Sequence, residues 1–374
     1  MRLMLLTIRE HPGTQGGIQT FLRTLKKYFN EDAFFVTTVI PKKEDILFNI
    51  IDLKNISAFQ NNKYFHLIGR TFSKISREAF KKDVLNLIYK KQLKSFDGIS
   101  ILASPKDIKI VNKKCKKILV QHTNVSNLIK SKSNFFNSNK LIEKAEKELD
   151  VFVALSPKDK ELIENTFKLE KGKVVCIRHS CELPLLEEKK EKSKNLIMIS
   201  RLDNTSKRFD LAMKAMKKLP NYNLNIYGDG KDRKILETLR AKLALKNVIF
   251  HGKTNKVKEK LDENGIFIMT SDYEGYGITN IEAMRRGLPI ILRDTYEAAS
   301  DIVQGNGVLL EKEWNEDKFV KAVYEVYKNY EEYSLKSIEL GKRHNPKTIK
   351  VHWEKLFEEL TNSFRECQGE EGVI

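Results

Sequence analysis

The sequence predicts an α/β protein built from two doubly wound parallel sheets. Short apolar runs alternate with longer helical patterns along the chain, which is typical of parallel strands joined by helical crossovers. The 374 residues suffice for two domains of ordinary size, and a hydrophobic content of 41% suffices for two cores. The charged stretch 187–194 is poor in apolar residues and divides the chain into two units.

The strands are predicted from apolar runs of three to six residues. In the first unit these runs are Leu3–Thr7, Phe34–Val39, Ile99–Leu102, Lys117–Val120, Val151–Leu155 and Val174–Ile177. In the second they are Leu196–Ile199, Leu224–Tyr227, Val248–Phe250, Ile266–Met269 and Ile290–Leu292. We therefore expect one Rossmann-like domain over residues 1–186, a second over 187–350, and a C-terminal segment over 351–374. The stretch Val351–Leu360 in that segment is amphipathic.

The composition narrows the range of partners. The formal net charge is +18, which is compatible with a solvated basic surface or with attraction to an anionic membrane or polymer. No helix-turn-helix, zinc-finger or aromatic RNA-binding motif is present, so we expect no nucleic-acid partner. No run approaches the roughly 18 apolar residues of a membrane span, and the charged N-terminus does not fit a signal peptide. We expect a cytoplasmic protein, either free or peripheral on the inner face of the membrane.

The first candidate ligand loop directly follows the first strand. Gly16 and Gly17 are adjacent there, and adjacent glycines let a backbone approach a ligand closely. A helix predicted to start near Ile18 would direct its positive end at that ligand. A tight strand-to-helix turn without any ligand explains the same residues, because a short glycine motif is weak by itself.

The second candidate loop, Ser200–Phe209, follows the first strand of the second unit. Arg201 can form forked hydrogen bonds to a phosphate, and Lys207 can add a point charge. Two fixed cations would stabilise negative charge on a phosphate without a metal. Arg208 is the alternative to Lys207, and an exposed basic loop is the alternative to a phosphate site.

Two smaller features also follow predicted strands. Gly228 and Gly230 flank Asp229 at the end of the run Leu224–Tyr227, where they fit either a ligand loop or an ordinary turn. His122 follows the run Lys117–Val120, and a single histidine in that place is either structural or directed at a ligand.

Two glutamates, eight positions apart, are the strongest feature of the chain. Glu274 lies in a glycine loop after the run Ile266–Met269, and Glu282 lies in a helix predicted to begin at Ile278. A strand, a glycine loop and a helix in this order present free backbone N–H groups to a phosphate. A ligand that carries both phosphates and hydroxyls would use the N–H groups and the carboxylates.

This pattern of Glu, seven residues and Glu, with Gly-aromatic-Gly after the first Glu, resembles the signature of the family-4 retaining glycosyltransferases of the GT-B fold. The Gly-Gly pair, the Arg and Lys loop, the Gly-Asp-Gly loop and the histidine occur in the family's order. The resemblance implies a cleft between the domains, with the donor on the C-terminal domain and the acceptor on the N-terminal one. It also implies that the last helix crosses back to the first domain.

The resemblance assigns roles to these residues. Glu282 would bind the ribose hydroxyls and Glu274 the hydroxyls of the transferred sugar. The catalytic residues would be Glu274, Arg201, Lys207 and His122. The donor would be bound by Gly16, Gly17, Arg201, Lys207, Gly228, Gly230, Glu274, Gly277, Ile278, Thr279 and Glu282.

The sequence departs from the family at two places. The Pro-Asn common at the domain junction is replaced within Ile177–Ser180, and the Gly-Gly after Ile290–Leu292 is replaced within Arg293–Ala299. No two Asp residues are separated by one position, so the Asp-any-Asp metal motif of the other glycosyltransferase fold is missing. We expect neither an essential metal nor a cofactor.

The predicted function is retaining transfer of a hexose or N-acetylhexosamine from a nucleotide sugar, with UDP-glucose or UDP-N-acetylglucosamine as the expected donor. The C-terminal half is similar to glycosyltransferases of teichoic acids and bacterial surface polysaccharides, so a glycan, teichoic-acid or lipid-linked acceptor is expected. A basic amphipathic stretch from Arg70 to Lys94 suits an anionic membrane or an ordinary surface helix. The alternatives are a sugar-nucleotide epimerase of the same fold and a non-catalytic protein that binds glycan or nucleic acid.

Overall fold

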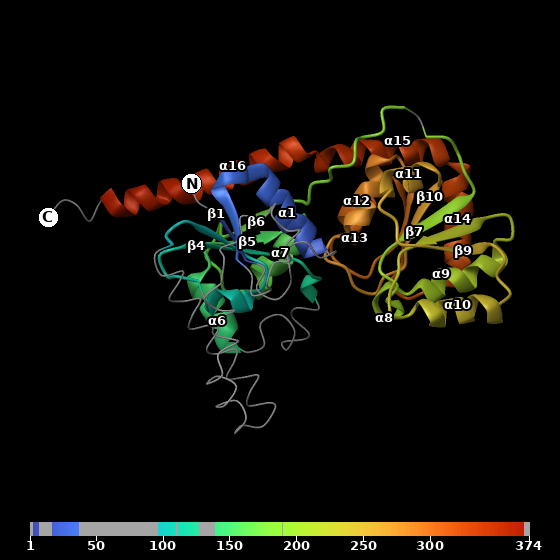
Figure 1. Cartoon of the computed structure of the whole chain (residues 1–374), viewed down its shortest axis with the longest axis horizontal. Coiled ribbons are helices and arrows are strands. Elements are labelled where there is room, and N and C mark those ends of the chain that lie inside the picture. Colours follow the sequence, from blue (N-terminus) through green and yellow to red (C-terminus); the bar gives the residue numbers. More distant parts are fainter. Residues whose placement is uncertain are drawn as a thin grey trace, which may run out of the picture.

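The computed structural model describes residues 3–6, 17–36, 96–109, 111–126, 139–188 and 190–369. They form two α/β domains, each with a six-stranded parallel sheet, that lie side by side (Figure 1). The predicted fold class is therefore confirmed. Gly16 and the basic stretch from Arg70 to Lys94 lie outside the described residues.

The N-terminal sheet has the strand order β2-β1-β3-β4-β5-β6. Its strands are β1 (Leu3–Leu6), β2 (Ala33–Val36), β3 (Ile99–Leu102), β4 (Lys116–Val120), β5 (Val151–Ala154) and β6 (Val174–Cys176). The helices are α1 (Gly17–Phe29), α6 (Asn139–Glu148) and α7 (Pro157–Thr166), with short 3-10 turns η1 (Asn30–Asp32) and η2 (Pro105–Lys109). Ser156 caps α7 by accepting a hydrogen bond from the Asp159 N–H.

The C-terminal sheet has the order β12-β11-β10-β7-β8-β9, which is the Rossmann order. Its strands are β7 (Asn195–Ile199), β8 (Asn223–Tyr227), β9 (Val248–Gly252), β10 (Ile266–Met269), β11 (Ile290–Arg293) and β12 (Gly307–Leu310). The apolar runs predicted all of these except β12. This edge strand is mostly half-buried, so it lacks the fully apolar run of a central strand.

The helices of the C-terminal domain follow the strands in turn. They are α8 (Asn204–Lys207), α9 (Phe209–Ala215), α10 (Arg233–Lys242), α11 (Val257–Asp262), α12 (Ile278–Arg285), α13 (Ala299–Ile302), α14 (Glu316–Lys328) and α15 (Tyr330–Gly341). Two 3-10 turns, η3 (Met216–Lys218) and η4 (Lys342–His344), complete the domain before α16 (Pro346–Gly369).

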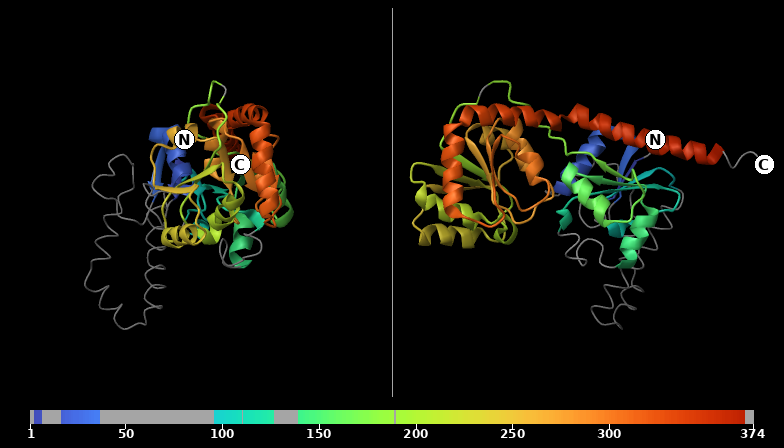
Figure 2. Two further views of the ribbon diagram at one scale, coloured as in Figure 1. Left: turned by 90° about the vertical axis from the view of Figure 1, so that its right-hand side faces the viewer. Right: turned by 180° about the vertical axis from the view of Figure 1, so that it is seen from behind.

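Each sheet is covered by hydrophobic residues on both faces, because successive strand residues point to opposite sides. In β4, Leu119 belongs to one cluster, whereas Ile118 and Val120 belong to the other. Helix α16 extends from the C-terminal domain along the N-terminal one, as Figures 1 and 2 both show. Its buried Trp353 and Phe357 join the cluster that contains Phe21 of α1, so α16 ties the two domains together.

The charged stretch 187–194 precedes β7, and most of its described residues are exposed. Lys190 is an exception, since it is buried and its Nζ donates to the Asp262 carbonyl at 2.8 Å. Burial lowers the pKa of Lys190 to about 8. The stretch is therefore held to the C-terminal domain at this point.

Candidate active site

The strand order of the C-terminal sheet determines where a ligand can bind. The chain leaves β7 toward β8 on one side, whereas β10 lies on the other side of β7. In such sheets ligands bind outside the carboxyl ends of the strands at this switch point. The loops after β7 and β10 carry Lys207 and Glu274, respectively, so the topology brings the two predicted loops together.

Lys207 and Glu274 form an ion pair between these loops, with side chains only 17% and 13% exposed. The Ser271 hydroxyl also donates to Glu274 Oε1, at 3.1 Å. The loop backbones are joined as well, because Thr270 Oγ1 donates to the carbonyls of Lys207 and Arg208. The arrangement fixes one cation and one carboxylate at the switch point.

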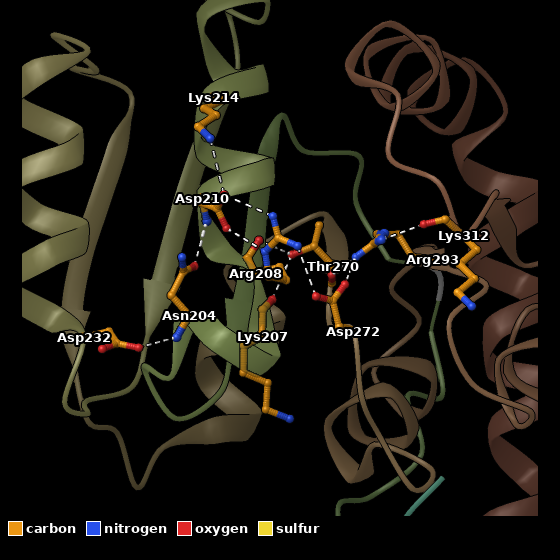
Figure 3. A network of polar contacts seen from close by, with 10 residues as sticks. All are labelled: Asn204, Lys207, Arg208, Asp210, Lys214, Asp232, Thr270, Asp272, Arg293 and Lys312. Atoms are coloured by element: carbon orange, nitrogen blue, oxygen red, sulfur yellow. Dashed lines mark hydrogen bonds and ion pairs between the residues drawn. The ribbon is translucent and has the colours of Figure 1, made fainter. Parts of the chain in front are cut away.

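Arg208, the alternative to Lys207, has a different environment. It adopts a left-handed backbone with φ of 51° and pairs with Asp210 and Asp272. Arg293 pairs with the same Asp272 at 2.6 Å, which extends the network to β11. Figure 3 shows Arg208 inside this network, whereas the Lys207 side chain points away from it. Lys207 is therefore the basic side chain of this loop that reaches Glu274.

Arg201 is 75% exposed, and its Nη2 lies 3.8 Å from Asp203 Oδ2. Such a loose, solvated pair contributes little to stability. The guanidinium group therefore lies at the surface and is available to an anion.

Gly228 and Gly230 bring the loop after β8 into close contact with the loop after β7. A Cβ atom on Gly228 would lie 1.8 Å from the Ser200 carbonyl oxygen, and one on Gly230 would lie 2.5 Å from that of Leu202. The Leu202 N–H also donates to the Asp229 carbonyl at 3.0 Å. The described contacts thus explain both glycines by backbone packing, which positions the loop that carries Arg201 and Lys207.

The helix after the glycine loop is α12, as predicted. Gly277 caps it with a φ of 77°, which a side chain rarely tolerates. The first N–H groups of α12, those of Ile278 and Thr279 among them, have no partner within the helix because of helix geometry. They are free to bind an oxygen of a ligand.

Glu282 is held one turn into α12. Burial of its carboxyl group raises the pKa to about 7. It forms no hydrogen bond or ion pair with any other residue in the described part of the chain. The Glu282 side chain is half-buried, so a ligand that reaches it could supply the partner that the described residues do not.

The N-terminal domain approaches the same loop. A Cβ atom built on Gly17 would lie 3.9 Å from Ile278, and one on Gly275 would lie 2.8 Å from the His122 carbonyl oxygen. Nε2 of His122 is buried without a hydrogen-bond partner, and its ring contacts Phe21 at 5.2 Å between centroids. Burial, together with nearby His179, lowers the pKa of His122 to about 3, so this ring is neutral at pH 7.

A pocket of about 890 Å³ opens between the domains beside this site. Asn124 and Lys158 line it from the N-terminal domain, whereas Asp272, Tyr273 and Glu297 line it from the C-terminal one. Glu297 accepts a hydrogen bond from Ser126 across the domain boundary. The pocket borders the loop of Glu274 and is large enough for a sugar.

Sequence reasoning missed a buried cluster behind the glycine loop. The Tyr276 hydroxyl donates to Asp301 Oδ2 at 2.8 Å, and Arg178 donates to both oxygens of Asp301 at 2.7 Å. Arg178 stands in the segment that lacks the family's Pro-Asn, and Asp301 follows the loop that lacks its Gly-Gly. These two departures from the family pattern were the only sequence signal. They did not indicate that the two segments meet in the fold.

Among the described residues, no group of three or more His, Cys, Asp or Glu side chains is arranged to hold a metal ion. Within the same residues, no helix is both long enough and apolar enough to cross a membrane.

The fold and the switch-point site define a protein of the GT-B class. Residues 186–344, within the C-terminal part of the chain, match the family model described as glycosyl transferases group 1. The chain is 29% identical over 189 residues to poly(glycerol-phosphate) alpha-glucosyltransferase of Bacillus subtilis, covering 47% of this chain and 28% of that protein. It is 27% identical to poly(ribitol-phosphate) alpha-N-acetylglucosaminyltransferase of Staphylococcus aureus, covering 65% and 52%. The chain thus spans about half or less of these relatives.

An uncharacterized glycosyltransferase of Haemophilus influenzae is 26% identical and is covered over 89% of its length, with 86% of this chain. Among solved structures, TarM superposes with a TM-score of 0.71 at 17% identity, covering 96% of this chain and 99% of that one. Anabaena HepE in complex with UDP superposes with a TM-score of 0.72 at 13% identity, covering 96% and 100%. These likenesses establish the GT-B fold over almost the whole chain.

Proposed function

We propose that this protein is a glycosyltransferase that transfers a sugar from a UDP-sugar to a bacterial surface glycan. The single observation that supports this best is the arrangement of Lys207, Glu274 and Glu282 at the switch point of a group 1 domain. UDP-glucose and UDP-N-acetylglucosamine are the proposed donors, since similar proteins are named for glucose and N-acetylglucosamine transfer.

In this proposal Glu282 accepts hydrogen bonds from both ribose hydroxyls, because an ionised carboxylate offers several acceptor sites. The N–H groups of Ile278 and Thr279 bind donor oxygens at the positive end of α12. The ion pair between Glu274 and Lys207 weakens when the donor binds, and Glu274 then accepts hydrogen bonds from hydroxyls of the transferred sugar. The neutral ring of His122 faces the same sugar with its unpartnered Nε2.

Cleavage of the glycosidic bond leaves negative charge on the diphosphate. Lys207 and Arg201 would stabilise that charge as it develops, and no metal is needed for this. The acceptor hydroxyl attacks from the face that the diphosphate leaves, so the anomeric configuration is retained. The pocket between the domains would hold the acceptor, for which we propose a teichoic-acid, polysaccharide or lipid-linked glycan.

The test is the thermal unfolding of the purified protein with a panel of nucleotides and nucleotide sugars. A ligand at 100 times its Kd stabilises the fold by about 2.7 kcal/mol. We expect stabilisation by uridine nucleotides that is lost in Glu282→Ala and weakened in Arg201→Ala. No stabilisation by any nucleotide would overturn the proposal.

The same preparation distinguishes a transferase from an epimerase. A sugar-nucleotide epimerase would convert its nucleotide sugar without an acceptor, whereas a transferase requires one for more than slow hydrolysis. UDP release that depends on an added glycan supports the transferase.

A further inference from the structure

A second pocket lies at the end of the N-terminal domain that is opposite to the candidate active site. It measures about 400 Å³, and five lysines line it: Lys113, Lys114, Lys116, Lys117 and Lys147. We call it the lysine pocket. Two carboxylates, Glu148 and Asp150, also line it. Their two negative charges do not balance the five positive charges of the lysines.

Both carboxylates are already engaged. Asp150 pairs with Lys116 at 3.2 Å and accepts the Lys117 N–H at 2.8 Å. Glu148 pairs with Lys144, on its own helix, at 3.4 Å. Neither carboxylate therefore neutralises the other lysines of the pocket.

Lys117 is only 4% exposed, and among the described residues its Nζ donates to two carbonyl oxygens, those of Lys113 at 3.4 Å and Cys115 at 3.1 Å. A buried ammonium group without an anionic partner is costly. The side chains of Lys113, Lys114 and Lys147 form no ion pair with other described residues. An anion in the pocket would satisfy several charges at once.

The lysine pocket is separate from the candidate active site. Lys116 and Lys117 begin β4, whereas His122 follows its other end. Five strand residues span about 16 Å at about 3.3 Å each. The diphosphate of a donor bound at Lys207 and Glu274 therefore cannot occupy the lysine pocket.

We propose that the lysine pocket binds phosphate groups of an anionic polyol-phosphate polymer, at a point remote from the reacting end of the chain. Lysine ammonium groups bind phosphate as point charges. A recessed pocket suits a single polymer unit better than a membrane plane. Among the described residues, none of the large exposed apolar side chains lines the pocket as a membrane anchor would.

A second contact of this kind would raise the local concentration of acceptor at the cleft. That the bound polymer is also the acceptor rests on the proposed function. The binding itself does not, and it can be measured without nucleotide or turnover.

The experiment measures binding of a synthetic poly(glycerol phosphate) oligomer to the full chain by calorimetry. The test variant carries Lys113→Gln, Lys114→Gln and Lys147→Gln, which remove exposed and unpaired charges. The control carries Lys217→Gln, Lys234→Gln and Lys246→Gln, three exposed lysines of the C-terminal domain without ion pairs among the described residues. Both lower the net charge equally.

We expect the Kd to rise at least tenfold in the test variant and less than threefold in the control. Competition by inorganic phosphate at constant ionic strength would support recognition of the phosphate group. Equal weakening in both variants would mean that only net charge matters, and would overturn the proposal. Selective loss of binding to phosphatidylglycerol vesicles, with polymer binding unchanged, would overturn it in favour of a membrane.

The polymer-binding experiment can be interpreted even if no nucleotide stabilises the protein. Polymer binding that depends on the lysine pocket, without any nucleotide binding, would refute the transferase and keep the pocket. Nucleotide binding with unchanged polymer affinity in the test variant would refute the lysine pocket and keep the transferase.

Discussion

Two residues of one loop, Glu274 and Tyr276, face opposite surroundings and form two different clusters. Glu274 pairs with Lys207, and the loop that carries Glu274 borders the pocket between the domains. Tyr276 points into the protein, where Asp301 accepts from its hydroxyl and from two nitrogens of Arg178. We call the first cluster open, because its loop borders the pocket, and the second closed, because Asp301 is engaged by three donors within the protein.

The difference follows from how each charge is satisfied. Burial alone would raise the pKa of Asp301, but the two hydrogen bonds and the positive charge of Arg178 outweigh it and lower that pKa. The pair of Lys207 and Glu274 leaves acceptor and donor positions free for a ligand. We infer that the closed cluster holds the loop so that the open one stays in place. Four predictions test this contrast, from the largest expected effect to the smallest.

Asp301→Ala should reduce the free energy of unfolding by about 3 kcal/mol, because it leaves the Arg178 guanidinium and the Tyr276 hydroxyl without their shared acceptor. Chemical denaturation measures this loss. The double variant Arg178→Met with Asp301→Leu should lose less, since it leaves no lone charge. A loss under about 1 kcal/mol in Asp301→Ala would show that the cluster is not structural.

Glu274→Gln should slow acceptor-dependent UDP release by about 10²- to 10³-fold, the range found when one group that stabilises a transition state is removed. Its free energy of unfolding should change by only about 1 kcal/mol, because the glutamine keeps an oxygen that can accept from Lys207 and Ser271. Steady-state kinetics and denaturation are measured on the same preparation. Full activity in Glu274→Gln would remove the carboxylate from the mechanism.

Tyr276→Phe should lower the free energy of unfolding by about 1.5 kcal/mol, the value of a hydrogen bond to a charged group. The phenyl ring keeps the packing, so the change isolates the hydroxyl. If the closed cluster also positions the open one, the variant should lower kcat while the KM for the donor changes little. A change of stability alone would limit the cluster to folding.

UDP-glucose should bind about tenfold more weakly at pH 6 than at pH 8, because the raised pKa of Glu282, about 7, leaves it largely protonated at the lower pH. Its diphosphate does not titrate in this range, so Glu282 is the group tested. Calorimetry at both pH values measures the effect, and Glu282→Gln should abolish it. Equal pH dependence in that variant would contradict the assignment.

The same raised pKa sets the sign of a stability effect. The native carboxyl group binds its proton more tightly than the unfolded one, with a pKa near 4.5. Its favourable contribution is therefore present below pH 4.5 and is lost as the pH rises through about 7. Ribose hydroxyls bound to the ionised Glu282 should oppose this loss of stability.

Much of this protein is determined by local sequence. Apolar runs predicted eleven strands, because a strand buried on both faces must be apolar along its length. The glycine loop and α12 were predicted for a similar reason, since only glycine fits the backbone at Gly277. The edge strand β12 was missed because half-buried residues leave a weaker pattern.

Tertiary structure alone decided which of these residues meet. The sequence favoured Lys207 with Arg208 as the alternative, and the network of Arg208 with Asp210 and Asp272 separates them. Arg178 and Asp301 are 123 positions apart, so no local pattern could join them. Burial decided the rest, because the unpaired carboxyl group of Glu282 and the lysine pocket depend on what the fold excludes from water.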